Sequence, residues 1–135
     1  MYQRHLIGKL GEDVSIKFLM KRGFAVVARN YRKKYGEIDV IAKKTGKLHF
    51  IEVKTVSCEM VSREGKTIIN NSKQLFRVEE NVHQKKLHSL FLTIQAYLAE
   101  QFVDKEQEWQ LDVHVVYLDV RKKTAKVDVL ENVAY

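Results

Sequence analysis

Gly36-Glu37-Ile38-Asp39-Val40-Ile41-Ala42 is one of the two stretches that decide the fold of this 135-residue chain, and Leu48-His49-Phe50-Ile51-Glu52-Val53-Lys54 is the other. Both are short apolar runs rich in β-branched residues, which is typical of strands. The segment between them, Lys43-Lys44-Thr45-Gly46, has the composition of a turn. Together they predict two strands, over residues 37–42 and 47–54, that pair as a hairpin.

Each predicted strand carries an acid among apolar neighbours, Asp39 on the first and Glu52 on the second. An ionised carboxylate is costly to bury unless it is paired or bound to a cation. Side chains alternate along a strand, so Glu52 and Lys54 share one face, and the hairpin brings Asp39 opposite them. Two converging carboxylates are the ligands that Mg²⁺ prefers. We therefore expect Asp39 and Glu52 to hold Mg²⁺, or Mn²⁺ in its place, beside the Lys54 ammonium.

Other interpretations of these acids stay open. Asp39 and Lys54 would instead form a cross-strand ion pair if Glu52 lay at a solvated edge. Glu37 is either a further metal ligand or a polar end to its strand. Glu64-Gly65-Lys66 repeats the Glu-X-Lys pattern in a segment without strand periodicity, so that tripeptide alone does not indicate a site.

The rest of the chain predicts an α/β domain over residues 1–135. An apolar stripe indicates a helix over residues 3–22, at Leu6, Leu10, Val14 and Phe18, widened by Ile7 and Leu19. A second stripe indicates a helix over residues 79–102, at Val82, Leu87, Leu90, Ile94 and Leu98. Further strands are expected over 24–31, 109–119 and 125–130, and a long loop over 55–74. This order predicts a mixed sheet flanked by helices.

The charge and composition of the chain limit the kinds of partner that it is expected to bind. The chain has 24 Lys plus Arg against 17 Asp plus Glu, a formal charge of +7, which favours a polyanion such as nucleic acid. Basic residues gather around two predicted turns, where they would contact phosphates: Arg29, Arg32, Lys33, Lys34, Lys43, Lys44 and Lys47. Tyr31 and Tyr35 would stack on bases or pack at strand ends. One cysteine and no long apolar run favour a cytoplasmic protein without a membrane span.

Residues from Gly8 to Tyr117 resemble the YraN-type family of small bacterial proteins. That family is similar to the archaeal Holliday junction resolvases and to the wider PD-(D/E)XK nuclease superfamily. The resemblance rests on six motifs: Gly8-Lys9-Leu10-Gly11-Glu12, Arg29-Asn30-Tyr31-Arg32, Gly36-Glu37-Ile38-Asp39-Val40-Ile41-Ala42, Phe50-Ile51-Glu52-Val53-Lys54-Thr55, Gln84-Lys85-Lys86-Leu87 and Leu111-Asp112-Val113.

The resemblance implies the restriction-endonuclease-like αβββαβ core, here with an added C-terminal strand. It makes Asp39, Glu52 and Lys54 the catalytic motif, Glu12 a further metal ligand and Gln84 a polar residue that a helix directs at the site. The implied activity is Mg²⁺-dependent cleavage of structured or branched DNA, and a homodimer would suit a substrate with two equivalent cuts. A non-catalytic nucleic-acid-binding module and a subunit of a larger DNA-processing complex are the alternatives.

Overall fold

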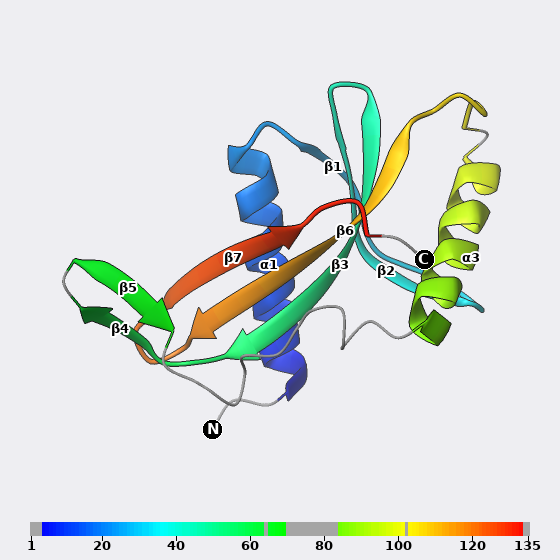
Figure 1. The fold of residues 1–135 in the computed structure, drawn as a ribbon. Coiled ribbons are helices and arrows are strands. Elements are labelled where there is room, and N and C mark those ends of the chain that lie inside the picture. The colour runs from blue at the N-terminus through cyan, green and yellow to red at the C-terminus, as the bar shows by residue number, and fades with distance from the viewer. Residues whose placement is uncertain (1–3, 64, 70–83, 102, 134–135) are drawn as a thin grey trace.

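The computed structural model describes residues 4–63, 65–69, 84–101 and 103–133, and its central feature is a five-stranded sheet in the order β1-β2-β3-β6-β7 (Figure 1). In chain order the elements are α1 (Arg4–Lys21), β1 (Ala25–Lys33), β2 (Gly36–Lys44), β3 (Lys47–Ser57), β4 (Met60–Arg63), β5 (Lys66–Ile69), α3 (Gln84–Glu100), β6 (Trp109–Asp119) and β7 (Thr124–Leu130).

The sheet is mixed. β1, β2 and β3 pair as antiparallel hairpins, and β6 and β7 pair in the same way. β3 and β6 are parallel, because the chain between them crosses over through α3. This is the αβββαβ order with an added C-terminal strand, so the expected fold class is confirmed and is consistent with a restriction-endonuclease-like fold.

The two helices lie on opposite faces of the sheet. Alternate residues of β2 and β3 belong to different core clusters: Val40 and Ile51 pack with Leu19 of α1, whereas Ile41 and Phe50 pack under α3. In Figure 1, α1 passes behind β3, β6 and β7, and α3 stands beside β2. The hairpin that carries the predicted acids is therefore covered from both sides.

The buried face of α1 differs from the predicted apolar stripe. Gly11, Ser15 and Leu19 are the buried residues of this helix, while Leu6 and Leu10 are 44% and 41% exposed. The helix lies so close to β3 that a Cβ on Gly11 would come within 1.9 Å of Thr55 Oγ1. The small side chains of Gly11 and Ser15 permit this close approach, so they lie at the interface with Leu19, which the stripe predicted, whereas Leu6 and Leu10 do not.

The stripe of α3 is confirmed within the described residues. Leu87, Leu90 and Ile94 are buried in the cluster that also contains Phe50 and Tyr97. Tyr31 of β1 meets Tyr97 edge to face, with ring centroids 5.2 Å apart. Tyr31 is therefore a packing residue at its strand, as one of the two interpretations proposed.

The long loop predicted over residues 55–74 is wrong for most of its described part. β3 extends to Ser57, and β4 and β5 then form a two-stranded hairpin, paired from Met60↔Ile69 to Arg63↔Lys66. The predicted start of the second helix and Val82 lie outside the described residues. Within the described ranges, no helix combines the length and the apolar character that a membrane crossing requires.

Candidate metal and nucleic-acid site

The candidate site lies where β2 and β3 part. Their paired residues run from Lys44↔Lys47 to Val40↔Ile51. Beyond that pair, β2 stays with β1 as far as Gly36, and β3 stays with β6 as far as Ser57. The next residues along the two strands are Asp39 and Glu52, so the predicted acids stand at this strand fork, which is visible as the divergence of β2 and β3 in Figure 1.

Asp39 closes the fork with its side chain. Its Oδ2 accepts a hydrogen bond from the Val53 backbone N–H at 2.8 Å. That N–H would point to a β2 carbonyl if the strands continued as a ladder, and a buried N–H needs a partner. One Asp39 oxygen is thus held by β3, and the carboxylate is fixed next to Glu52.

Two further acids join Asp39 and Glu52. Glu12 of α1 and Glu37 of β2 both act electrostatically on Asp39. They are linked by the Asn30 amide, which in the orientation that presents its NH₂ donates to Glu12 Oε1 at 3.1 Å and to Glu37 Oε1 at 2.9 Å. We call Glu12, Glu37, Asp39 and Glu52 the carboxylate cluster.

The backbone conformation of Asn30 allows its side chain to bridge two of these acids. It lies in β1 with a φ of 49°, in the left-handed region. Asparagine tolerates this conformation better than most residues. Its neighbours Arg29 and Tyr31 pair with Val40 and Ile38, so Asn30 stands opposite Asp39. The sequence motif contains Asn30, but nothing in the motif indicates this bridging role.

Burial, with nearby carboxylates adding to it, raises the pKa values of Glu12, Asp39 and Glu52. Burial, and next the Glu52 carboxylate, raise the pKa of Asp39 to about 7. Burial also raises the pKa of Glu52, although Lys86 acts in the opposite direction. The pKa of Glu12 is raised by burial and by Glu37. A positive charge placed among these oxygens would relieve the cost, which is the condition that a cation site satisfies.

Among the described side chains, the lysine closest to Glu52 is Lys86 of α3. Its Nζ lies 2.9 Å from Glu52 Oε1, and the two side chains are 53% and 13% exposed. Burial opposes a charge on Lys86, but the hydrogen bond and attraction of Glu52 raise its pKa overall. Lys54, the lysine predicted from the Glu-X-Lys pattern, is exposed and influences Glu52 less than Lys86 does.

The basic residues do not surround the cluster as one surface. Arg32, Lys33 and Lys34 lie at the β1–β2 turn, whereas Lys43 and Lys44 lie at the other end of β2. A nine-residue strand at about 3.3 Å per residue separates the two turns. Asp39 lies near the middle of this strand, so one turn stands on either side of the site, and contact of either turn with nucleic acid stays a prediction.

Several predicted phosphate-binding cations already have acidic partners. Arg29 Nη2 lies 2.7 Å from Asp13 Oδ1, and Arg32 Nη2 lies 2.8 Å from Glu37 Oε2. Lys33 pairs with Glu100.

Gln84, the polar residue expected to face the site, is the first residue of α3, and its side chain lies outside the described part of the chain.

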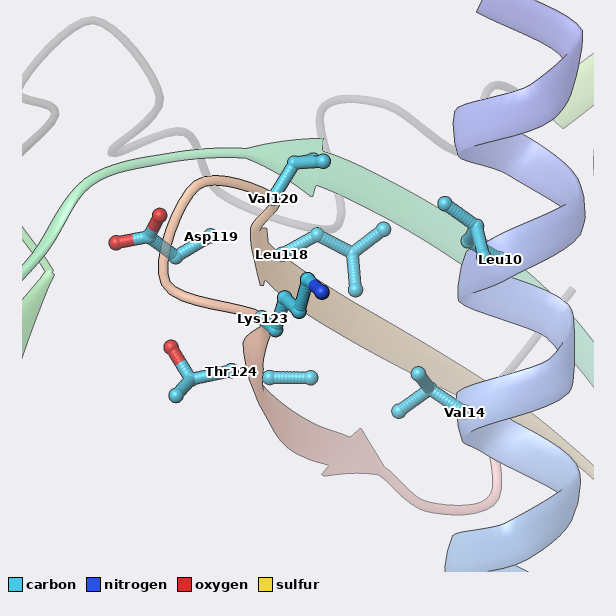
Figure 2. A pocket seen from close by; sticks show the side chains of 8 residues that line it. Leu10, Val14, Leu118, Asp119, Val120, Lys123 and Thr124 are labelled. Carbon is cyan, nitrogen blue, oxygen red and sulfur yellow. The ribbon is translucent and has the colours of Figure 1, made fainter. Parts of the chain in front are cut away.

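A separate hollow of about 360 Å³ between α1 and the β6–β7 hairpin has a different character (Figure 2). Leu10 and Val14 of α1 face Leu118 across it. The acid at its rim, Asp119, accepts hydrogen bonds from the backbone N–H groups of Met60 at 2.8 Å and Lys122 at 3.1 Å. This hollow is apolar and its carboxylate is engaged in hydrogen bonds, so it differs from the carboxylate cluster in both lining and charge.

Two buried histidines have polar partners away from the carboxylate cluster, and one of them anchors α1 to the sheet. Ser15 Oγ and His114 Nδ1 are 2.7 Å apart, and burial lowers the pKa of His114 to about 4. His49 Nδ1 lies 2.7 Å from Asp112 Oδ2. Across residues 4–63, 65–69, 84–101 and 103–133, no three His, Cys, Asp or Glu side chains stand ready-arranged around a metal position.

The family model and the relatives reported from comparisons with known proteins all belong to one family. A family model described as "Uncharacterised protein family UPF0102" matches residues 11–129. A UPF0102 protein of Campylobacter jejuni subsp. doylei is 37% identical over 116 residues, which cover 86% of this chain and 88% of the relative. One from Campylobacter lari is 33% identical over 132 residues, or 98% of this chain and 96% of the relative. One from Dictyoglomus thermophilum is 41% identical over 95 residues, or 65% and 80%.

Proposed function

This chain belongs to the uncharacterised protein family UPF0102, and we propose that it is a metal-dependent endonuclease that hydrolyses phosphodiester bonds, with structured or branched DNA as its substrate. UPF0102 is the YraN-type family, so the resemblance found in the sequence is confirmed. The observation that carries the proposal is the carboxylate cluster at the strand fork, where the pKa of Asp39 is raised to about 7.

The carboxylates of the cluster have the chemistry that a divalent cation requires, although no three of them stand ready-arranged around a metal position in the described residues, so a bound ion would draw them together. Asp39 and Glu52 come from adjacent strands and Glu12 from the helix packed over them, so three elements present oxygen ligands. Burial, and next the neighbouring carboxylates, raise the pKa values of these acids, and a cation among them would offset that cost. Mg²⁺, or Mn²⁺, would polarise a phosphodiester and lower the pKa of a bound water.

Other groups of the protein would position the carboxylates and neutralise charge on the substrate. The Val53 N–H holds Asp39 Oδ2 and so fixes the orientation of the carboxylate, whose Oδ1 would face the ion. Asn30 positions Glu12 through its amide. The Lys86 ammonium, with Lys54 farther out, would neutralise charge that develops on the phosphate oxygens.

A non-catalytic nucleic-acid-binding module is the second candidate, and one observation favours it. The Lys86–Glu52 ion pair satisfies one carboxylate of the cluster without any metal. If that pair persists on the substrate, the fold would bind nucleic acid without cutting it. A partner subunit that completes the site would give the same result for the isolated chain.

The decisive experiment compares Asp39→Ala and Glu52→Ala with wild type on labelled junction, flap and linear substrates, in Mg²⁺, in Mn²⁺ and without metal. Cleavage should need metal and should fall by about 10²-fold or more in both variants, because each removes a carboxylate at the reacting phosphate. Asp128→Ala is the matched control, since Asp128 is exposed on β7 at the far edge of the sheet. Wild-type cleavage by Asp39→Ala would rule out the proposed function.

A further inference from the structure

Another hollow, which is polar, adjoins the carboxylate cluster between the first turns of α1 and strand β1. It has a volume of about 530 Å³ and is lined by His5, Gly8, Lys9, Glu12, Arg29 and Asn30. The four helical residues stand at positions i, i+3, i+4 and i+7, so they form one face of α1. We call this hollow the α1–β1 groove.

The groove shares residues with the carboxylate cluster. Glu12 belongs to both, and Asn30 joins Glu12 to Glu37 through its amide. One end of the groove is thus acidic and opens on the fork. The other end carries His5 and Lys9, which are both exposed.

The basic end has the features that an anion requires. Lys9 and His5 lie one helical turn apart, and Arg29 approaches from β1. One Arg29 nitrogen is held by Asp13 at 2.7 Å, which fixes the guanidinium and leaves its other N–H groups to donate. The first turn of α1 contains no acid, so no carboxylate there offsets the charge of Lys9.

Gly8 has no side chain to cover the α1 backbone at the bottom of the groove. A Cβ built at Gly8 would have no heavy atom within 4 Å. The backbone of α1 is therefore open to a ligand between His5 and Lys9. Any larger residue at position 8 would narrow the groove beside Lys9.

We propose that the α1–β1 groove binds a backbone phosphate of the nucleic-acid strand, next to the phosphate that lies at the carboxylate cluster. The inference rests on the proposed function, because it takes the strand to cross the fork. Glu12 repels a phosphate from its own end, so the bound phosphate lies at the His5 and Lys9 end. Contacts of this type position the strand and do not read its sequence.

The test measures binding of a labelled DNA junction to the full chain without metal, by fluorescence anisotropy over a series of salt concentrations. Lys9→Gln should weaken binding several-fold and reduce the slope of log K against log [salt] by about 1, as expected for one lost phosphate contact. Lys9→Arg should keep both values near those of wild type. Lys17→Gln is the matched control, because Lys17 is an exposed lysine of the same helix outside the groove.

The outcomes separate the groove from the proposed activity. Equal losses of affinity in Lys9→Gln and Lys17→Gln would refute the phosphate site in the groove, since the change in net charge alone would then explain both losses. The absence of any wild-type binding would overturn both proposals. Selective loss in Lys9→Gln, with no cleavage under any metal condition, would support the groove and refute the nuclease. Unchanged melting temperatures would show that the variants fold.

Discussion

At the scale of single residues, two lysines act on Glu52 from different elements. Lys54 is two residues away on β3, and Lys86 reaches Glu52 from α3, where it forms an ion pair at 2.9 Å. Glu52 is almost buried, so removal of its partner leaves a poorly solvated carboxylate. The exposed Lys54 has no comparable effect on the folded state.

Lys86→Gln should therefore lower the free energy of unfolding of the metal-free protein by about 1 kcal/mol, a value reduced for the exposure of Lys86. Lys54→Gln should change it by only a few tenths of a kcal/mol. Added Mg²⁺ should restore part of the loss in Lys86→Gln, because a cation takes the place of the ammonium beside Glu52. Thermal melts with and without Mg²⁺ measure this. Equal destabilisation by the two substitutions would contradict the assigned ion pair.

At the scale of elements, the position of α1 depends on how closely it approaches β3. The contact is made by Gly11 against Thr55, and Ser15 anchors the next turn through His114. This packing places Glu12, the neighbour of Gly11, beside the fork. A helix held farther from the sheet would withdraw that carboxylate from the cluster.

Gly11→Ala should destabilise the protein by about 1–3 kcal/mol, because the new Cβ has no room against Thr55 and the helix must shift. Gly8→Ala is the control on the same helix, with open space around the added methyl. It should be neutral, or stabilising by up to about 1 kcal/mol, since alanine favours a helix. Denaturant unfolding compares the two. Similar stabilities for both variants would refute the close approach.

At the scale of the whole molecule, two buried groups make folding depend on pH in opposite directions. Asp39 has a folded pKa of about 7 against an ordinary 3.8, so the folded state holds the extra proton and stability falls as the pH rises between these values. The pKa of His114 is lowered to about 4 from 6.5, so the unfolded state holds the extra proton and stability rises over that range. The two effects oppose each other in wild type.

A comparison of Asp39→Asn with wild type isolates the first effect. The melting temperature of Asp39→Asn should exceed that of wild type by an amount that is small near pH 4 and grows toward pH 7 to 8, because only wild type must ionise a buried carboxyl there. The measurement is a set of metal-free melts from pH 4 to 8. A difference that does not change with pH would mean that Asp39 titrates normally.

Much of the architecture follows from local sequence pattern. The β6 strand matches its prediction over residues 109–119, and the hairpin strands differ from theirs by a few residues. The stripe Leu87, Leu90 and Ile94 identified the buried face of α3. The β4–β5 hairpin was missed, because its short strands carry polar and charged residues without a regular alternation.

The sequence by itself determined that Asp39 and Glu52 share a hairpin, since a period of two residues and a short turn act over less than 20 residues. Only the tertiary structure decided which groups surround them. Glu12 lies beside these two acids because Gly11 lets α1 pack closely on β3. Lys86 reaches Glu52 because α3 covers β2 on the opposite face of the sheet. Asn30 contributes through a left-handed backbone position in β1. These placements depend on how helices pack against a finished sheet, and no local pattern encodes the distances between elements that meet only after folding.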